Sequence, residues 1–189
     1  MRQLSAEDKR YLLYLARRSL EASVGNQTVN APEDVPSVLF SPGSAFVTLH
    51  HQSRLRGCVG YYPPVKPLYI TVMEAASAAG LRDSRFPKVC AEELGGLELE
   101  ISVLSNFRQV DPEEIQVGMH GLIVSQGSLR GLLLPQVAVA RSWTSLRFLE
   151  ETCRKAGLPL DAWRHGTKVE LFTAEIFSEQ TLAMEKASG

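Results

Sequence analysis

The sequence lacks the features that would assign it to several large classes of protein. No run of apolar residues approaches the roughly 20 that a membrane-spanning helix needs. The N-terminal segment carries acidic residues where a signal peptide would have its apolar core. The net charge of −1 comes from interspersed acids and bases, so there is no basic stripe for a nucleic-acid backbone or an anionic membrane. We therefore expect a cytoplasmic protein that binds neither nucleic acid nor membrane.

Cysteine is scarce, and the familiar catalytic motifs are missing. Cys58, Cys90 and Cys153 are odd in number and form no C-x-x-C pair, so the sequence predicts neither a disulfide framework nor a zinc ribbon. There is no Walker, G-x-G-x-x-G or G-x-S-x-G motif to indicate nucleotide-dependent or serine-hydrolase chemistry. Reduced thiols are the expected state of all three cysteines.

The sequence does contain well-marked helix and strand patterns. Its 189 residues suffice for one domain, or one domain with a small lobe, that buries its own core. Residues 5–25 combine a capping box, apolar positions at helical spacing and a final glycine, which predict a helix. A Pro-rich, irregular connection is expected over residues 26–43.

Strand patterns dominate the rest of the chain. Two hairpins are predicted, over residues 45–61 and 121–134, each around a polar turn. Strict alternation over 97–103 predicts a half-buried strand, and a last strand is expected near 168–177. Two further helices are predicted, at 67–79 and 146–156. Strands joined mostly by turns, with helices between them, predict an α+β fold on a largely antiparallel β-sheet with packed helices.

Several sequence blocks resemble the signature of the AMMECR domain family. Leu55–Gly60, Asp83–Pro87 and Glu100–Leu104 occur in the family's order, and Val59 is the one departure, because the family usually carries Ile there. Later blocks resemble the family as well, at 117–122, 134–138 and 153–158. The resemblance implies a single AMMECR domain over 1–189. Its signature covers about 45–179, and the N-terminal helix and Pro-rich connection occupy 1–44.

The closing blocks are most similar to a prokaryotic branch of this family, called AmmeMemoRadiSam system protein A. Members of that branch are encoded beside a Memo-like protein and a radical SAM protein. The resemblance therefore implies a cytoplasmic protein with Memo-like and radical SAM partners. It implies no settled activity, so the chemistry has to be inferred from individual residues.

Cys58 is the residue most suggestive of chemistry. It lies between Gly57 and Gly60 in a predicted strand, where glycines usually mark a bulge or a spot that a ligand or backbone approaches closely. Arg56 or a nearby imidazole would favour the reactive thiolate. The alternative is a small buried residue in a tightly packed hairpin. We predict a functional thiol at Cys58, with Arg56 and Gly57 contributing to ligand binding.

Four further residues are candidates for the same site. His120 is a candidate base or ligand contact, or else a turn histidine satisfied by backbone hydrogen bonds. Glu100, on the polar side of its strand, is a candidate acid/base, although a solvated strand face is the commoner meaning. Asp83 and Arg85 lie in one loop and are candidate ligand contacts. The alternative is that they form an internal salt bridge that anchors the loop. Arg56 and Arg85 together could clamp a carboxylate or phosphate.

These residues leave two functions open. In the first, the protein is an enzyme or enzyme component that binds a small anionic or carbonyl-bearing substrate, with Cys58 as nucleophile. In the second, it is a non-catalytic adaptor or accessory subunit whose cleft recognises a segment or modified residue of a Memo-like or radical SAM partner. No ligand spacing demands a metal ion.

Overall fold

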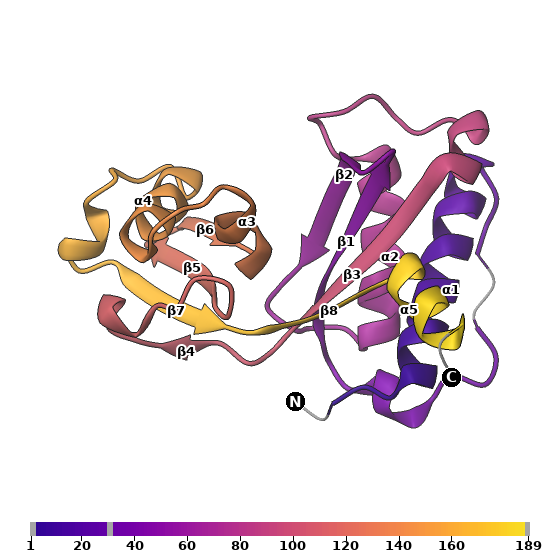
Figure 1. Ribbon diagram of the computed structural model, residues 1–189, viewed down its shortest axis with the longest axis horizontal. Helices are drawn as coiled ribbons and strands as arrows, with labels where there is room; N and C mark the ends of the chain where they lie inside the picture. Colours follow the sequence, from indigo (N-terminus) through magenta and orange to yellow (C-terminus); the bar gives the residue numbers. More distant parts are fainter. Residues whose placement is uncertain (1–2, 30–31, 188–189) are drawn as a thin grey trace. The chain divides into compact units, whose positions relative to one another are not determined.

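Residues 3–29 and 32–187 are described by a computed structural model of the protein. They divide into two units. The larger unit contains the described residues up to Val103 and those from Ile176 onward, and the smaller unit is Leu104–Glu175. Each unit has its own four-stranded sheet (Figure 1). In the described part of the chain, no helix has the length and apolar character needed to cross a membrane.

The larger unit is built on a sheet with the strand order β2-β1-β3-β8. Its strands are β1 (Ser44–His51), β2 (Arg54–Tyr61), β3 (Leu97–Leu104) and β8 (Ala174–Ser178). Its helices are α1 (Ala6–Val24), α2 (Leu68–Leu81) and α5 (Glu179–Ala187), with 3₁₀ turns at Ser37–Phe40 and Ala91–Gly96. Helix α2 packs on β1 and β2, and α1 packs on α2 (Figure 1). Because β2 comes first in the strand order, one of its sides has no neighbouring strand.

Helix α1 begins and ends where the sequence predicts. The Ser5 hydroxyl accepts a hydrogen bond from the Asp8 backbone N–H at 3.1 Å, and the Ser5 N–H donates to the Asp8 carboxylate at 2.9 Å. Both halves of the capping box are therefore formed. Gly25 caps the other end. The apolar stripe of the helix is buried in the core of the larger unit, at Leu12, Ala16 and Leu20.

Strands β1 and β2 form the predicted antiparallel hairpin. Gln52 and Ser53 connect them with φ values of 50° and 61°, in keeping with a type I′ turn, which needs positive φ at both central residues. The register shifts between Leu49 and His50, which pair with Gly57 and Leu55. Arg56 is thus an extra residue in β2, and the strand contains a β-bulge immediately before Gly57 and Cys58.

Strand β3 has the alternation that the sequence predicts. Its apolar residues are buried in the same core as α1 and α2, at Leu97, Leu99, Ile101 and Val103. Glu98 and Glu100 are half-buried on the opposite side, and Ser102 on that side is 1% exposed. The sheet therefore has one side in the apolar core and a second side that carries polar residues.

The smaller unit has the strand order β4-β7-β5-β6. Its strands are β4 (Arg108–Gln109), β5 (Gly121–Gln126), β6 (Leu129–Leu133) and β7 (Lys168–Phe172). Its helices are α3 (Pro135–Ala140) and α4 (Ser145–Lys155), with 3₁₀ turns at Pro112–Glu114 and Ala162–Arg164. Strands β5 and β6 form the second predicted hairpin, and α4 packs on both. The predicted fold class, α+β with largely antiparallel sheets and packed helices, is confirmed.

Three details differ from the sequence-based prediction. The last strand, predicted as one element, is two strands in different sheets, with a break at Thr173. No glycine or proline marks this break, so the strand pattern of the sequence continues across Thr173 and gives no sign that the strand ends there. Helices α3 and α5 were not predicted, and α3 has only 6 residues, too few for a periodic signal. Pro67 is the N-cap of α2 rather than its first helical residue, because its ψ of 139° is extended.

Candidate functional site

Cys58 lies in the edge strand β2, opposite Thr48 of β1. The Thr48 hydroxyl donates a hydrogen bond to the Cys58 sulfur over 3.3 Å. Cys58 is half-buried, whereas Cys153 is buried in the core of the smaller unit and Cys90 is exposed. The Cys58 thiol is therefore partly shielded by its neighbours without being enclosed in an apolar core.

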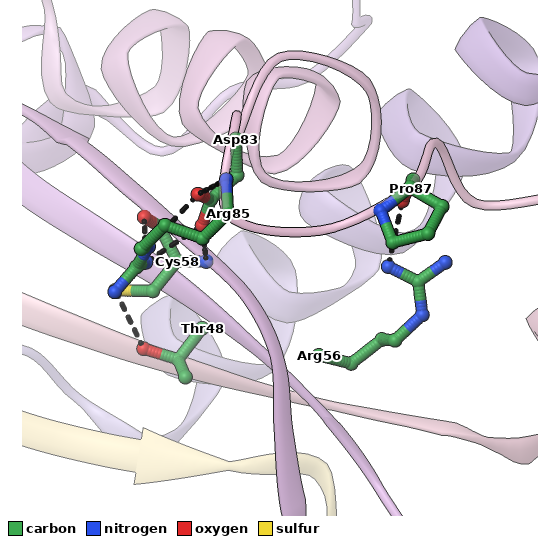
Figure 2. A network of polar contacts seen from close by, with 6 residues as sticks. All are labelled: Thr48, Arg56, Cys58, Asp83, Arg85 and Pro87. Atoms are coloured by element: carbon green, nitrogen blue, oxygen red, sulfur yellow. Dashed lines mark hydrogen bonds and ion pairs between the residues drawn. The ribbon is translucent and has the colours of Figure 1, made fainter.

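The loop after α2 covers the free side of β2 at Cys58. The Asp83 carboxylate accepts a hydrogen bond from the Cys58 backbone N–H at 2.8 Å, and Arg85 Nη2 donates to the Cys58 carbonyl at 3.2 Å. Figure 2 shows both side chains meeting the strand at this residue. An edge strand leaves backbone N–H and C=O groups without a ladder partner. At Cys58, the two side chains of the loop take the place of the missing strand.

Asp83 and Arg85 also bind each other. Arg85 Nη2 lies 2.6 Å from Asp83 Oδ2 and Nε lies 2.9 Å from Oδ1, a bidentate ion pair. The Asp83 side chain is 6% exposed and that of Arg85 is 55% exposed. The guanidinium, aided by the backbone N–H groups of Cys58 and Arg85, lowers the pKa of Asp83 from 3.8 to about 2 and outweighs the opposing effect of burial. Asp83 is therefore charged at neutral pH.

Arg56 is directed to a different carboxylate. Its Nε and Nη2 donate to the two carboxylate oxygens of Glu93 at 2.8 and 2.9 Å, and its Nη1 donates to the Pro87 carbonyl at 2.9 Å. Figure 2 shows the Arg56 side chain extending toward Pro87. Arg56 is the main cause of the low pKa of Glu93, which falls from 4.5 to about 2. Each arginine is thus bound to its own carboxylate, and Arg56 ties the bulge of β2 to the segment after Pro87.

The glycines that flank Cys58 have a packing explanation. A Cβ on Gly57 would lie 2.2 Å from the Ala79 carbonyl oxygen of α2, and a Cβ on Gly60 would lie 2.2 Å from the Phe46 ring. Both distances are far shorter than van der Waals contact, so any larger residue would displace the helix or the ring. The bulge and these two close approaches account for the glycine pattern that drew attention to this strand.

Glu100 lies on the same side of the sheet as Cys58. The side chains of Leu99 and Ile101 enter the core, so Glu100 points to the opposite side, as does Thr48, the partner of Cys58. We call this side, with Thr48, Cys58, Glu100 and Ser102, the polar face. Because β1 separates β2 from β3, the strands that carry Cys58 and Glu100 are about 10 Å apart, two strand spacings.

His120 lies in the smaller unit, immediately before β5. Its Nδ1 accepts a hydrogen bond from the Gln116 N–H at 3.1 Å, and its own N–H donates to the Gln116 carbonyl at 3.0 Å. This is the geometry of a turn histidine satisfied by backbone groups. Within the larger unit, the structure brings together Thr48, Cys58, Asp83 and Arg85, which we call the Cys58 site.

Sequence reasoning missed two residues of this region. Thr48 reaches the thiol only because of the hairpin register, and its one signal is a polar residue inside an apolar strand pattern. Glu93 holds Arg56 from a 3₁₀ turn, and nothing in its local sequence indicates that role. Within residues 3–29 and 32–187, no cluster of three or more His, Cys, Asp or Glu side chains is arranged to hold a metal ion.

Comparisons with known proteins give a consistent result. Residues 13–177 match a family model described as AMMECR1. A Thermofilum pendens protein is 43% identical and the match covers 96% of this chain and 94% of that protein. A Methanothermobacter thermautotrophicus protein is also 43% identical, with coverages of 93% and 96%. The crystal structure of an uncharacterised Pyrococcus horikoshii protein has the same fold, with 41% identity and a TM-score of 0.89 over 93% of each chain.

Proposed function

We propose that this chain, which belongs to the AMMECR1 family, binds a small ligand or a modified residue at the Cys58 site. One observation carries the proposal, the set of groups that meet at Cys58 in an edge strand. The thiol is half-buried, the Thr48 hydroxyl is hydrogen-bonded to its sulfur, and Arg85, whose side chain is exposed, binds its backbone carbonyl. Arg85 Nη1 makes no hydrogen bond within the described chain, so two of its donors are available to an anionic group. The ligand class we propose is a small anionic or carbonyl-bearing molecule.

Thiol-dependent catalysis is the further step of this proposal. A thiolate is the reactive form of cysteine, and a neighbouring guanidinium and a hydroxyl donor both stabilise negative charge on sulfur. Cys58 would then be the nucleophile, with Glu100 of the polar face in proton transfer. Asp83 cannot serve as an acid near neutral pH, because its pKa is about 2. Its role in the proposal is to hold Arg85 and the Cys58 backbone in place.

The second candidate function is a non-catalytic adaptor for cytoplasmic Memo-like and radical SAM partners, as in the AmmeMemoRadiSam system protein A branch. One observation favours it: the charged groups nearest Cys58 also hold the loop against β2, through Asp83, Arg85 and Arg56. Because these contacts fix the loop on β2, the loop and strand form a preformed surface that suits recognition of a partner segment. Co-purification with a tagged Memo-like and a tagged radical SAM protein would test this function directly.

Time-resolved labelling with iodoacetamide tests the Cys58 proposal. We expect Cys58 to be modified faster than Cys90 at neutral pH, although Cys90 is more exposed. The Glu92 carboxylate and, to a lesser extent, burial raise the pKa of Cys90, whereas Cys58 has Arg85 and Thr48 beside it. Cys153 should react last, because burial raises its pKa and blocks access. Peptide mass spectrometry follows the three thiols in one sample.

Two further arms make this experiment decisive. Arg85→Gln should slow labelling of Cys58, while Arg108→Gln, in the smaller unit, should leave it unchanged. The low-molecular-weight fraction of a cell lysate should protect Cys58 if it contains the ligand, and mass spectrometry would identify the molecule retained. A Cys58 that reacts no faster than Cys90 and does not respond to Arg85→Gln would contradict the proposal.

A further inference from the structure

We propose a second binding site, in a groove of the larger unit between α1 and α2, for an apolar molecule that carries one carboxylate. The groove has a volume of about 390 Å³, within the range of about 300–1,000 Å³ typical of small-molecule sites. It contains none of the residues of the Cys58 site, and the inference does not depend on the function proposed for that site.

One wall of the groove is apolar. Tyr69, Ile70 and Met73 of α2 line it, and Val29 and Pro32 line it from the connection after α1. All five are only half-buried, so they present apolar surface inside the groove. The exposed Phe40 ring extends this surface, because it packs edge-on against Tyr69 with 5.3 Å between ring centroids. An apolar chain or ring lying here would be removed from water on several sides.

The groove also contains polar side chains with few or no partners in the described chain. The Ser23 and Ser77 hydroxyls make no hydrogen bond to any described residue, and both side chains line the groove. Arg82 lines it as well, and the one hydrogen bond of its side chain to a described residue is a long contact of 3.5 Å from Nη2 to the Tyr61 hydroxyl. No carboxylate of the described residues binds Arg82, in contrast to Arg17, which is held by Glu179.

These groups match a carboxylate better than a cation. A guanidinium binds a carboxylate through two parallel hydrogen bonds, and hydroxyls can donate to the remaining lone pairs. Glu74, the acidic residue of the groove, is bound to Lys66 Nζ at 2.6 and 2.8 Å. The unbalanced charge in the groove is therefore the positive charge of Arg82. A single arginine suits one carboxylate, with the apolar part of the ligand along Tyr69, Ile70 and Met73.

Methionine-methyl NMR of the full chain, titrated with octanoate, tests this inference. We expect the Met73 methyl signal to shift and saturate, while the signal of Met119, an exposed residue of the smaller unit, stays in place. Arg82→Gln should weaken octanoate binding about tenfold, the effect of losing a charge-assisted hydrogen-bonded pair. Arg130→Gln, an exposed arginine of β6, is the matched control and should leave binding unchanged. Octylammonium, with the same chain and the opposite charge, should bind at least about tenfold more weakly.

A second variant tests the apolar part of the groove while leaving the charge of Arg82 unchanged. Ser77→Leu places an apolar side chain in the groove on an existing helix and should abolish the Met73 shift with octanoate. The inference is overturned if Met73 does not shift with octanoate in the wild type, if octylammonium binds as well as octanoate, or if octanoate affinity is unaffected by Arg82→Gln.

Discussion

At the scale of the residue, Cys58 is surrounded by contacts that do not depend on its sulfur. Asp83 and Arg85 bind its backbone N–H and carbonyl, and Thr48 is hydrogen-bonded to the thiol. Side-chain chemistry and local folding are therefore separable at this position. A substitution that keeps the backbone can remove the thiol and leave the strand and loop in place.

Cys58→Ser should accordingly cost less than about 1 kcal/mol of unfolding free energy, because a half-buried hydroxyl can hydrogen-bond with Thr48 or water. Cys153→Ser is the matched control. Its side chain is 0% exposed in an apolar core, so an added hydroxyl there should cost roughly 1–3 kcal/mol. Urea unfolding of both variants measures the difference. A loss at Cys58 as large as that at Cys153 would identify Cys58 as a core residue.

Asp83 is the residue on which the polar contacts converge. Its carboxylate accepts hydrogen bonds from the backbone N–H of Cys58 and from the backbone N–H, Nε and Nη2 of Arg85. Its folded pKa of about 2 lies below its ordinary value of 3.8, so its stabilising effect is complete above about pH 5 and is lost as the pH falls through about 2.

Asp83→Asn should therefore lower the unfolding free energy near pH 7 by roughly 1–2 kcal/mol, a range reduced because solvent screens the exposed Arg85. The difference from wild type should shrink toward zero as the pH is lowered from about 5 to about 2. Urea unfolding of both proteins across this range measures it. A difference that stays constant with pH would show that the lost stability comes from packing or from hydrogen bonds that do not depend on charge.

At the scale of the element, the distance between α2 and β2 is set at Gly57. Its missing side chain lets the Ala79 carbonyl of α2 approach the strand, and the bulge at Arg56 precedes this contact. The loop that follows α2 then delivers Asp83 and Arg85 to Cys58. The position of the loop relative to the thiol thus depends on how closely the helix lies on the hairpin.

Gly57→Ala should lower the unfolding free energy by roughly 1–3 kcal/mol or more, because the added methyl group would lie 2.2 Å from a backbone oxygen of α2. Gly95→Ala is the matched control, since a Cβ there meets nothing within 4 Å; its effect should stay within about 0.5 kcal/mol. Equal effects of the two variants, in thermal or urea unfolding, would show that α2 can shift away from β2 at little cost.

At the scale of the whole molecule, the described residues form two separate apolar cores. One contains α1, α2 and the first sheet, and the other contains α4 and the second sheet. The chain leaves the larger unit after Val103 and returns at Ile176. Two cores within one chain can differ in local stability, which amide hydrogen exchange resolves segment by segment.

Gly131→Ala should raise amide exchange in β5, β6 and α4 while α1 and α2 keep their protection. A Cβ at Gly131 would lie 2.5 Å from the Ala156 backbone nitrogen at the end of α4, within the smaller unit. Gly57→Ala should give the reverse pattern, because its clash is with α2. Hydrogen exchange followed by mass spectrometry would compare the two variants. A uniform rise across both units would show that they unfold together.

Most of the helices and strands, and the family, could be predicted from the sequence. The capping box of α1, both hairpins, the alternation of β3 and the α+β class follow from patterns within a few residues, and those patterns were confirmed. The signature blocks around Cys58 and Asp83 gave the family, which the match over residues 13–177 confirmed. The cysteine at the centre of the proposed site was also identified from sequence.

The surroundings of that cysteine could not be predicted from local sequence, because they come from distant segments. Cys58 and Asp83 are 25 residues apart, and Arg56 and Glu93 are 37 apart, so their contacts depend on the bulge, the hairpin register and the packing of α2. The assignment of His120 to the other unit and the break between β7 and β8 depend on the division of the chain into two cores. Local patterns reflect the conformational preferences of neighbouring residues. Contacts between distant segments are set by close packing and by the need to pair buried backbone groups.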